Sequence, residues 1–326
     1  MITGLHHVAL SVRDLDAAIA FYTSEQAFTL LHIFELADTE DNRAMLQVDN
    51  AAARVAFLQG TLGCLELFAF ECVAAQVAPE REVYSAGLRH ICLQTAISED
   101  LYDSLLAVGA TAHGRPAGLG TGNSYVYIRD PEGNLIELEG TPWAPADASR
   151  PWFAHMALVT PDVDALTRFY TLLTGVEIHQ RGKFGPDDKF DVVAGIAGVR
   201  FEGAWSRLAN AELEFWQYEH PATMPVQRRN AAAAGWSHLC FESNAIAADY
   251  ARLNAQGVEL HGPPHKCSNA LVFFGRDPDG NIFEVLQPGN AAAVTVSAML
   301  AEPQGSIVDA ARIAFRNGVS TPTQAG

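Results

Sequence analysis

Hydrophobic and polar positions alternate in short segments, and one order of segments recurs along the chain. A module opens on an apolar segment with period-two alternation, such as residues 7–12, followed by a polar turn at Asp14 and a stretch of helical periodicity that ends at Tyr22. Short runs rich in Val, Phe, Leu and Tyr follow, separated by Gly, Asn and Asp. This pattern predicts a βαβββ unit and an α+β fold.

The chain repeats itself. HVALSVRDLDAAIAFY, which begins at His7, returns as HMALVTPDVDALTRFY, which begins at His155, and His90 and His238 are separated by the same interval. Within each half, a strand led by histidine recurs 83 residues later, from His7 to His90 and from His155 to His238. A fixed interval of this kind is the signature of duplication. We therefore predict a tandem duplication of four βαβββ modules in two pairs.

The repeat predicts the boundaries of the domains. Residues 1–140 form a first paired domain, and residues 152–288 form a second. Residues 141–151, TPWAPADASRP, are rich in Pro and Ala without periodicity, which is typical of a linker. In the tail, 289–326, residues 306–317 have apolar positions at helical spacing. We expect this helix to dock on the body or on a second subunit in a homodimer.

Composition excludes several classes of partner. The net charge is −17, with 38 acidic and 21 basic residues, which works against a nucleic-acid partner because phosphate binding needs a basic face. No segment approaches the roughly 18 consecutive apolar residues of a membrane helix, and residues 1–10 carry no basic leader. The five cysteines lack CxxC spacing. These features predict a soluble, cytoplasmic protein that acts on a small molecule.

Every module carries a histidine in its first strand and a glutamate in its last strand, inside apolar runs. An unpaired buried carboxylate there would cost several kcal/mol, so each needs solvent, a cation or a metal. One such residue alone is more often a solvated glutamate or a hydrogen-bonded core histidine, but eight at matching positions predict a mixed nitrogen and oxygen site for divalent Ni, Co, Zn, Fe or Mn. The eight candidate ligands are His7, Glu66, His90, Glu137, His155, Glu214, His238 and Glu284. His6, by strand alternation, is expected to face away from His7.

These residues resemble the vicinal oxygen chelate superfamily, which includes glyoxalase I, methylmalonyl-CoA epimerase, extradiol dioxygenases and bleomycin and fosfomycin resistance proteins. The resemblance covers about residues 5–288 and is carried by HVAL, DLDAAIAFY, LELF, RHICL and RDPEGNLIELE, and again by HMAL, DVDALTRFY, ELEFWQY, SHLCF and RDPDGNIFEV. It implies that paired modules form curved half-barrels around a metal whose ligands come from first and last strands. Modules could pair with their neighbour in sequence, or the first with the fourth.

The complete ligand set resembles glyoxalase I, which implies a lyase or isomerase acting by metal-stabilised enediolate proton transfer on a small oxygenated substrate. In this interpretation Glu66 or Glu214, and Glu137 or Glu284, share the roles of ligand and base. The arginine pattern that holds glutathione in glyoxalase I is not found.

Two other functions fit the sequence. An extradiol dioxygenase would hold Fe(II) with two histidines and one glutamate, and His265 stands where the acid/base histidine of that group would be, although Phe274 replaces its tyrosine. A metal-free binding protein would need an aromatic cleft, and a glycine-rich loop at residues 118–122 is expected at its rim. Its lining candidates are Trp205, Trp216, Tyr218, Trp236 and Phe273.

Overall fold

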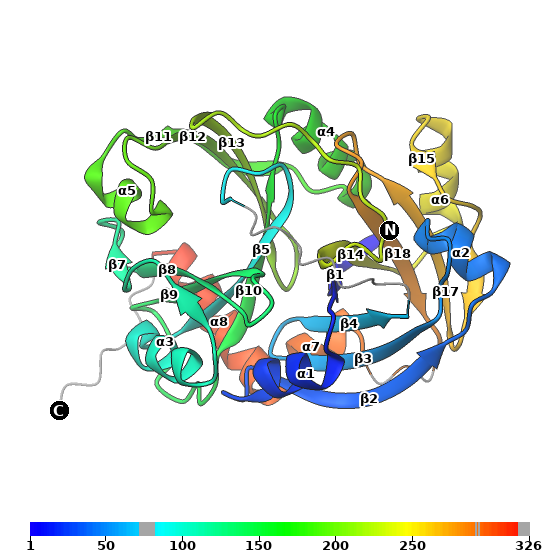
Figure 1. Cartoon of the computed structure of the whole chain (residues 1–326), viewed down its shortest axis with the longest axis horizontal. Coiled ribbons are helices and arrows are strands. Elements are labelled where there is room, and N and C mark those ends of the chain that lie inside the picture. Colours follow the sequence, from blue (N-terminus) through cyan, green and yellow to red (C-terminus); the bar gives the residue numbers. More distant parts are fainter. Residues whose placement is uncertain (72–81, 291, 293, 319–326) are drawn as a thin grey trace.

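The computed structural model describes residues 1–71, 82–290, 292 and 294–318. In this part of the chain, eight helices accompany two curved, nine-stranded sheets that do not close into barrels. Figure 1 shows the sheets beside each other, with the helices on their outer sides and between them. The α+β fold of tandem βαβββ modules predicted from the sequence is confirmed.

The first sheet is built from the first and fourth modules. Its strands, in spatial order, are β15 (Glu259–Leu260), β17 (Ala270–Arg276), β18 (Ile282–Pro288), β14 (Gly235–Ser243), β1 (Ile2–Ser11), β4 (Cys64–Phe70), β3 (Ala53–Gly60) and β2 (Phe28–Leu36), with β16 (His265–Cys267) paired to β17.

The second sheet is built from the second and third modules. Its strands, in spatial order, are β11 (Ile178–Phe184), β12 (Arg200–Arg207), β13 (Glu212–His220), β10 (Trp152–Val159), β5 (Gly87–Thr95), β9 (Leu135–Gly140), β8 (Ser124–Arg129) and β6 (Thr111–Ala112), with β7 (Ala117–Gly118) paired to β8.

The pairing left open by the sequence is thereby answered. The first strands of the two modules meet antiparallel at the centre of each sheet, β1 against β14 and β5 against β10. The boundaries 1–140 and 152–288 follow the sequence repeat, whereas each sheet takes strands from both halves. Neither half therefore forms a complete sheet by itself.

One helix follows the first strand of each module. These helices are α1 (Leu15–Thr23), α3 (Ser98–Ala107), α4 (Val163–Thr174) and α6 (Ile246–Ala255), and shorter helices α2 (Glu40–Leu46) and α5 (Asp188–Ala194) precede β3 and β12. Asp14 and Asp162 cap α1 and α4 by accepting hydrogen bonds from the backbone N–H of Ala17 and Ala165. The main core joins the apolar faces of these helices to the outward faces of both sheets, leaving the concave faces for other side chains.

Two buried tyrosine–aspartate pairs join the sheets. Tyr22 on α1 donates its hydroxyl hydrogen bond to Asp130 Oδ2 at 2.8 Å, and Tyr170 on α4 donates to Asp277 Oδ2 at 3.2 Å. Each aspartate begins the DPxGN turn of the next module, so each pair connects a helix of one module to a strand turn of the other sheet. The FY and DPxGN motifs therefore act together in the fold.

The tail folds back onto the body as α7 (Val296–Ala301) and α8 (Pro303–Arg316). The helix α8 includes most of the segment with helical spacing, 306–317, and its Val308 packs near Trp143 and Trp152. Arg312 donates to the carbonyls of Asn210 and Ala209 at 3.0 and 3.1 Å. This end of the tail is thus fixed beside β13.

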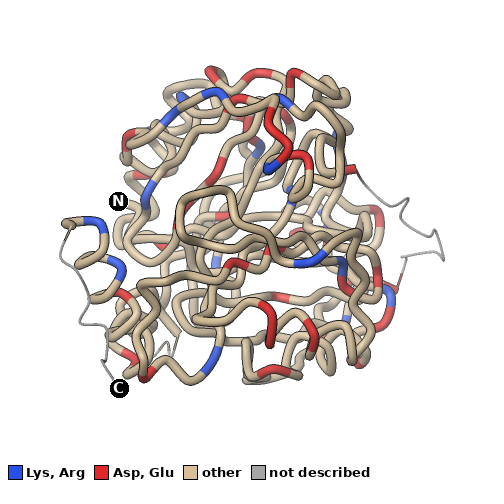
Figure 2. The backbone as a smooth tube through the Cα atoms, turned by 90° about the vertical axis from the view of Figure 1, so that its left-hand side faces the viewer, with Lys and Arg blue, Asp and Glu red and all other residues tan. Residues whose placement is uncertain are grey.

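Charged residues of both signs are dispersed along the backbone, and Figure 2 shows no continuous run of basic positions on the part of the chain drawn in full. None of the helices in the described ranges is long and apolar enough to cross a membrane.

Candidate metal centres

The strand register brings each histidine of one module next to its counterpart in the paired module. On β1 and β14, His7 lies opposite Cys240 and His238 lies opposite Ala9. The two histidines therefore share one face of the sheet, because side chains two positions apart point the same way. The parallel neighbours complete the set, with Glu66 beside Ala9 and Glu284 beside Cys240. The small Ala9 and Cys240 between the ligands leave room for four larger side chains to converge.

Site A is this first group, His7, Glu66, His238 and Glu284, and all four side chains are buried or nearly so. Nε2 of His7 lies 3.2 Å from Glu66 Oε2 and 3.3 Å from Glu284 Oε2. Nε2 of His238 lies 3.6 Å from Glu284 Oε2. Neither of these two Nε2 atoms has a well-formed hydrogen bond. Both imidazoles therefore face the space between the four side chains without a hydrogen-bond partner.

His6 does not face away from His7 as strand alternation predicts. A register shift between Leu5 and His7 bends β1 at this point, and the two Nδ1 atoms of His6 and His7 lie 2.8 Å apart. Burial and the neighbouring His7 lower the pKa of His6 to about 4. A neutral His6 therefore holds Nδ1 of His7 and leaves Nε2 of His7 for the carboxylates.

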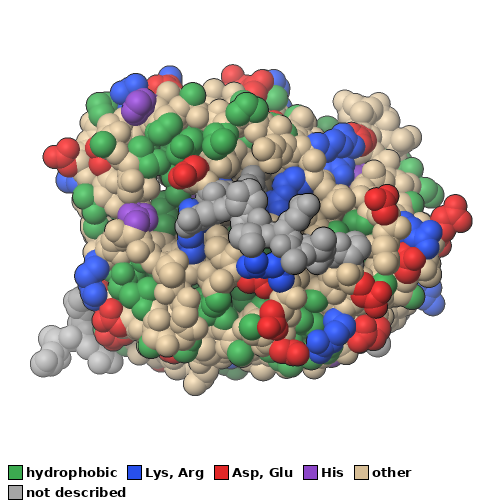
Figure 3. All heavy atoms as spheres, viewed as in Figure 1, with side chains coloured by type: hydrophobic (Ala, Val, Ile, Leu, Met, Phe, Trp, Pro, Cys, Tyr) green, Lys and Arg blue, Asp and Glu red, His purple; other side chains and the backbone are tan. Residues whose placement is uncertain are grey.

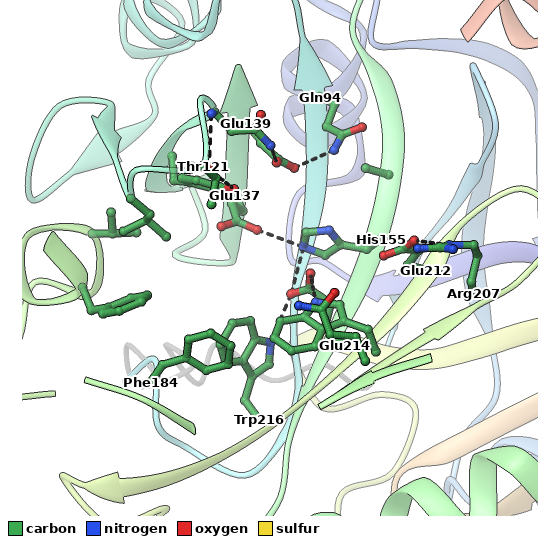
Figure 4. A pocket seen from close by; sticks show the side chains of 18 of the residues that line it. Gln94, Thr121, Glu137, Glu139, His155, Phe184, Arg207, Glu212, Glu214 and Trp216 are labelled. Atoms are coloured by element: carbon green, nitrogen blue, oxygen red, sulfur yellow. Dashed lines mark hydrogen bonds and ion pairs between the residues drawn. The ribbon is translucent and has the colours of Figure 1, made fainter. Parts of the chain in front are cut away.

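Site B is the second group, His90, Glu137, His155 and Glu214, arranged by the same register on β5, β9, β10 and β13. Nε2 of His155 lies 2.9 Å from Glu137 Oε2 and 3.4 Å from Glu214 Oε2. Nε2 of His90 lies 3.4 Å from both Glu137 Oε2 and the Nε2 of His155. In Figure 4, Glu137 lies to the left of the His155 ring and Glu214 lies below it.

The surroundings of site B shift the pKa values of its ionisable groups in different directions. Burial opposes ionisation of Glu137, but hydrogen bonds from His155 and His90 outweigh it and hold its pKa at about 2. Burial likewise disfavours charge on His155, but Glu214 and Glu137 raise its pKa to about 9. Burial dominates at Glu214 and raises its pKa to about 7. Without a metal, the group holds a proton on His155 beside the ionised carboxylate of Glu137.

Site B opens into a cavity of about 580 Å³, within the usual size of small-molecule sites. Glu137, His155 and Glu214 line it together with aromatic side chains of β11, β12 and β13. Leu119 and Thr121 of the glycine-rich loop also line it, where the sequence predicted a rim. In Figure 3, hydrophobic side chains gather on the surface over β11 and β12, which wall this cavity.

Two tryptophans orient Glu214. The indole N–H of Trp205 donates to Glu214 Oε1 at 2.8 Å, and that of Trp216 donates to Oε2 at 3.1 Å. Of the other aromatic residues predicted to line a cleft, Tyr218 also lines the cavity, whereas Trp236 and Phe273 belong to the core between the sheets. Strand alternation places Trp216 and Tyr218 on the face of β13 that carries Glu214. It does not place Trp236, which lies two positions before His238 but is turned into the core where the register between β1 and β14 shifts.

Several lining residues were missed by the sequence analysis. Arg207 and Glu212 occupy paired positions of β12 and β13, and Phe315 and Arg316 come from the tail helix. Glu139, on the strand of Glu137, accepts a hydrogen bond from Gln94 at 2.6 Å. The adjacent position of Arg207 and Glu212 follows from hairpin register, but nothing in the pattern indicated where the tail would lie.

His265 belongs to neither of the two four-residue groups. It sits on β16 in the sheet of site A, with Nε2 3.1 Å from the Sδ of Met45. Phe274, nine residues later, packs against the ring of His238 with 5.4 Å between centroids. In site B, Tyr127 packs against His90 at 5.0 Å, but Ala117 on β7 occupies the position that corresponds by register to His265.

Comparison with known proteins agrees with this architecture. The family model described as Glyoxalase/Bleomycin resistance protein/Dioxygenase superfamily matches residues 4–138 and 152–285. Glyoxalase I from Zea mays is 17% identical, with a TM-score of 0.60 over 92% of this chain and 94% of that one. A point mutant of the same enzyme has 18% identity and a TM-score of 0.62, covering 92% and 94%.

A putative dioxygenase from Bacillus subtilis is 16% identical, with a TM-score of 0.58 over 95% of this chain and 96% of that one. No curated protein sequence matches the chain. At these identities, the solved structures show a shared fold.

Proposed function

Since this chain belongs to the Glyoxalase/Bleomycin resistance protein/Dioxygenase superfamily, we propose that it is a metal-dependent enzyme with its active centre at site B. The observation that carries the proposal is a buried set of two imidazoles and two carboxylates at the wall of a cavity large enough for a small substrate. Site A supplies the same ligand types for a second ion.

The spacing of the side chains supports a metal in both sites. Ligand atoms about 2.1 Å from an ion and roughly 90–110° apart are separated by about 3.0–3.4 Å. The nitrogen–oxygen and nitrogen–nitrogen distances of site B range from 2.9 to 3.4 Å. In site A, the buried Nε2 atoms of His7 and His238 lack hydrogen-bond partners among the described residues. Histidine nitrogen and glutamate oxygen suit Ni, Co, Zn, Fe or Mn.

The complete four-residue set favours proton transfer of the glyoxalase kind, performed by a lyase or isomerase on a small oxygenated substrate. A bound divalent ion supplies Lewis-acid polarisation of a substrate oxygen, which acidifies the adjacent carbon. Glu137 lies within 3.4 Å of both imidazoles and is assigned to holding the ion. Glu214 is assigned to moving the proton, because Trp205 and Trp216 fix its carboxylate at the cavity wall.

A second candidate is an extradiol dioxygenase using Fe(II). It is favoured by His265, which the dioxygenase resemblance would use as an acid or base, on the sheet that carries site A. Against it, Phe274 stands in place of the tyrosine of that resemblance, while Tyr127 of site B is accompanied by Ala117 rather than a histidine. A metal-free binding role, the third candidate, would use only the aromatic lining of the cavity.

The test begins with elemental analysis of protein purified without air. Metal-loaded protein is then incubated in D₂O with a panel of hydroxy-ketones. NMR follows the replacement by deuterium of the hydrogen on the carbon that bears the hydroxyl. Replacing the base in general acid–base catalysis costs about 10²–10⁴-fold, so Glu214→Gln should lose exchange by that factor. The control Glu202→Gln alters a glutamate of β12 that pairs with Arg181 outside the cavity. If the protein contains iron, takes up oxygen with catechols and shows no hydrogen exchange, the dioxygenase function replaces this proposal.

A further inference from the structure

The cavity of site B has two unlike ends. In Figure 4, Phe184 and Trp216 lie on one side of His155, and Arg207 with Glu212 lies on the other. The aromatic end also contains Phe190 and Phe201, in contact with Phe184. Among the described residues, arginines line this cavity only at the end opposite the aromatic side chains. We call Arg207, Glu212 and Arg316 at this end the charged end.

The charged end holds more positive than negative charge. Arg207 Nε donates to Glu212 Oε1 at 2.9 Å, and Arg316 Nη2 donates to the same oxygen at 2.5 Å. Two guanidinium groups thus share one carboxylate. Arg312, adjacent on α8, is already occupied by Asp309 and by two backbone carbonyls. Burial, with Arg312 and Arg207 nearby, lowers the pKa of Arg316 to about 10, although Glu212 and Asp309 act in the opposite direction.

Site A shows that the fold does not require this charge. Gln59 and Cys64 occupy, 148 residues earlier, the paired positions of Arg207 and Glu212. There the tail closes the site with apolar groups, since Cys64 packs with Val296 and Met299 of α7. The same pair of strand positions is therefore uncharged and covered in site A, but charged and open to a cavity in site B.

We propose that Arg207 and Arg316 bind a carboxylate of the substrate. The inference rests on the proposed function, and it specifies the substrate class: a small monoanion with a carboxylate at one end, an apolar or aromatic group at the other, and adjacent oxygens between them that reach site B. Arginine suits this role because its planar fork matches a carboxylate in a two-bond arrangement. One carboxylate balances the single positive charge left by two arginines and Glu212.

The test compares two probes of similar size on protein loaded with Zn²⁺ in the absence of air. 3,4-Dihydroxybenzoate carries the carboxylate away from its adjacent oxygens, and 4-methylcatechol lacks the charge. Binding is measured by calorimetry for the wild type, Arg207→Gln, which introduces the residue found at position 59, and Arg316→Gln. The matched control is Arg181→Gln, on β11 of the same sheet, which pairs with Asp164 and Glu202 and does not line the cavity.

Hydrogen bonds to charged groups contribute enough to make about a tenfold difference in affinity. We expect the preference for the carboxylate probe to fall by about that factor in Arg207→Gln and Arg316→Gln, and to persist in Arg181→Gln. Metal content should be the same in all four proteins. An unchanged preference in both variants overturns the inference while leaving the metal proposal standing, whereas absence of bound Zn²⁺ overturns the proposed function itself. Competition by inorganic phosphate that exceeds competition by benzoate would overturn the assignment to a carboxylate.

Discussion

The hydrogen bond from Tyr22 to Asp130 is expected to contribute measurably to the stability of the whole chain. Both side chains are buried, with 3% and 4% of their surfaces exposed, and the hydroxyl oxygen lies 2.8 Å from Asp130 Oδ2. Asp130 also accepts from the backbone N–H of Glu132 and Asn134 and from the Asn134 side chain. In Tyr22→Phe, the aspartate keeps these three donors and loses one.

A hydrogen bond to a charged group contributes about 1.5–3 kcal/mol, so Tyr22→Phe should lower the free energy of unfolding by about 2 kcal/mol. Asp130→Ala should cost more, because it leaves several buried donors without an acceptor. The assay is urea unfolding followed by circular dichroism with a chelator present, so that metal binding does not contribute. Tyr250→Phe is the control, since the Tyr250 hydroxyl makes no hydrogen bond to any described residue. A loss below about 0.5 kcal/mol in Tyr22→Phe would refute the stabilising role of this pair.

Three further perturbations test the site and the tail. Ala157 lies buried between His90 and Glu214 in the sheet, so Ala157→Leu should lower the metal content by about one equivalent per chain in elemental analysis. Unchanged metal content would show that the side chains of site B do not converge on one ion. Trp205→Phe removes a donor to Glu214 and should slow hydroxy-ketone exchange by about tenfold with metal retained, and an unchanged rate would show that this indole does not position the carboxylate. Arg312→Ala should destabilise the chain by about 1–3 kcal/mol in urea unfolding, because the buried carbonyl of Asn210 and the partly buried carbonyl of Ala209 lose their donor, and wild-type stability would show that α8 is held by its apolar face alone.

Much of the fold could be predicted from the sequence, because it depends on local periodicity and on the repeat. The four first strands, their helices and the last strands carry patterns strong enough to identify a βαβββ unit. Placement of His7 and Glu66 on one face follows from alternation within strands that the sequence already delimits. Alternation failed at His6, where a shift in strand register changes the direction of the side chain.

The pairing of modules could not be predicted, because it depends on contacts between residues far apart in sequence. His7 with His238, and His90 with His155, meet across the antiparallel centres of the two sheets, and either module order would satisfy the same local pattern. The charged end was missed for the same reason. Arg316 reaches Glu212 only because α8 docks beside β13, and helical spacing in the tail does not specify a docking site.

Metal content of paired histidine variants tests the two centres most directly. If the ligands divide as site A and site B, the wild type should bind two equivalents per chain. His7→Ala combined with His238→Ala removes both imidazoles of one site and should leave one equivalent. His7→Ala combined with His90→Ala damages both sites and should leave none, with the fold checked by circular dichroism. Equal metal content in the two double variants, or full content in either, would contradict the account.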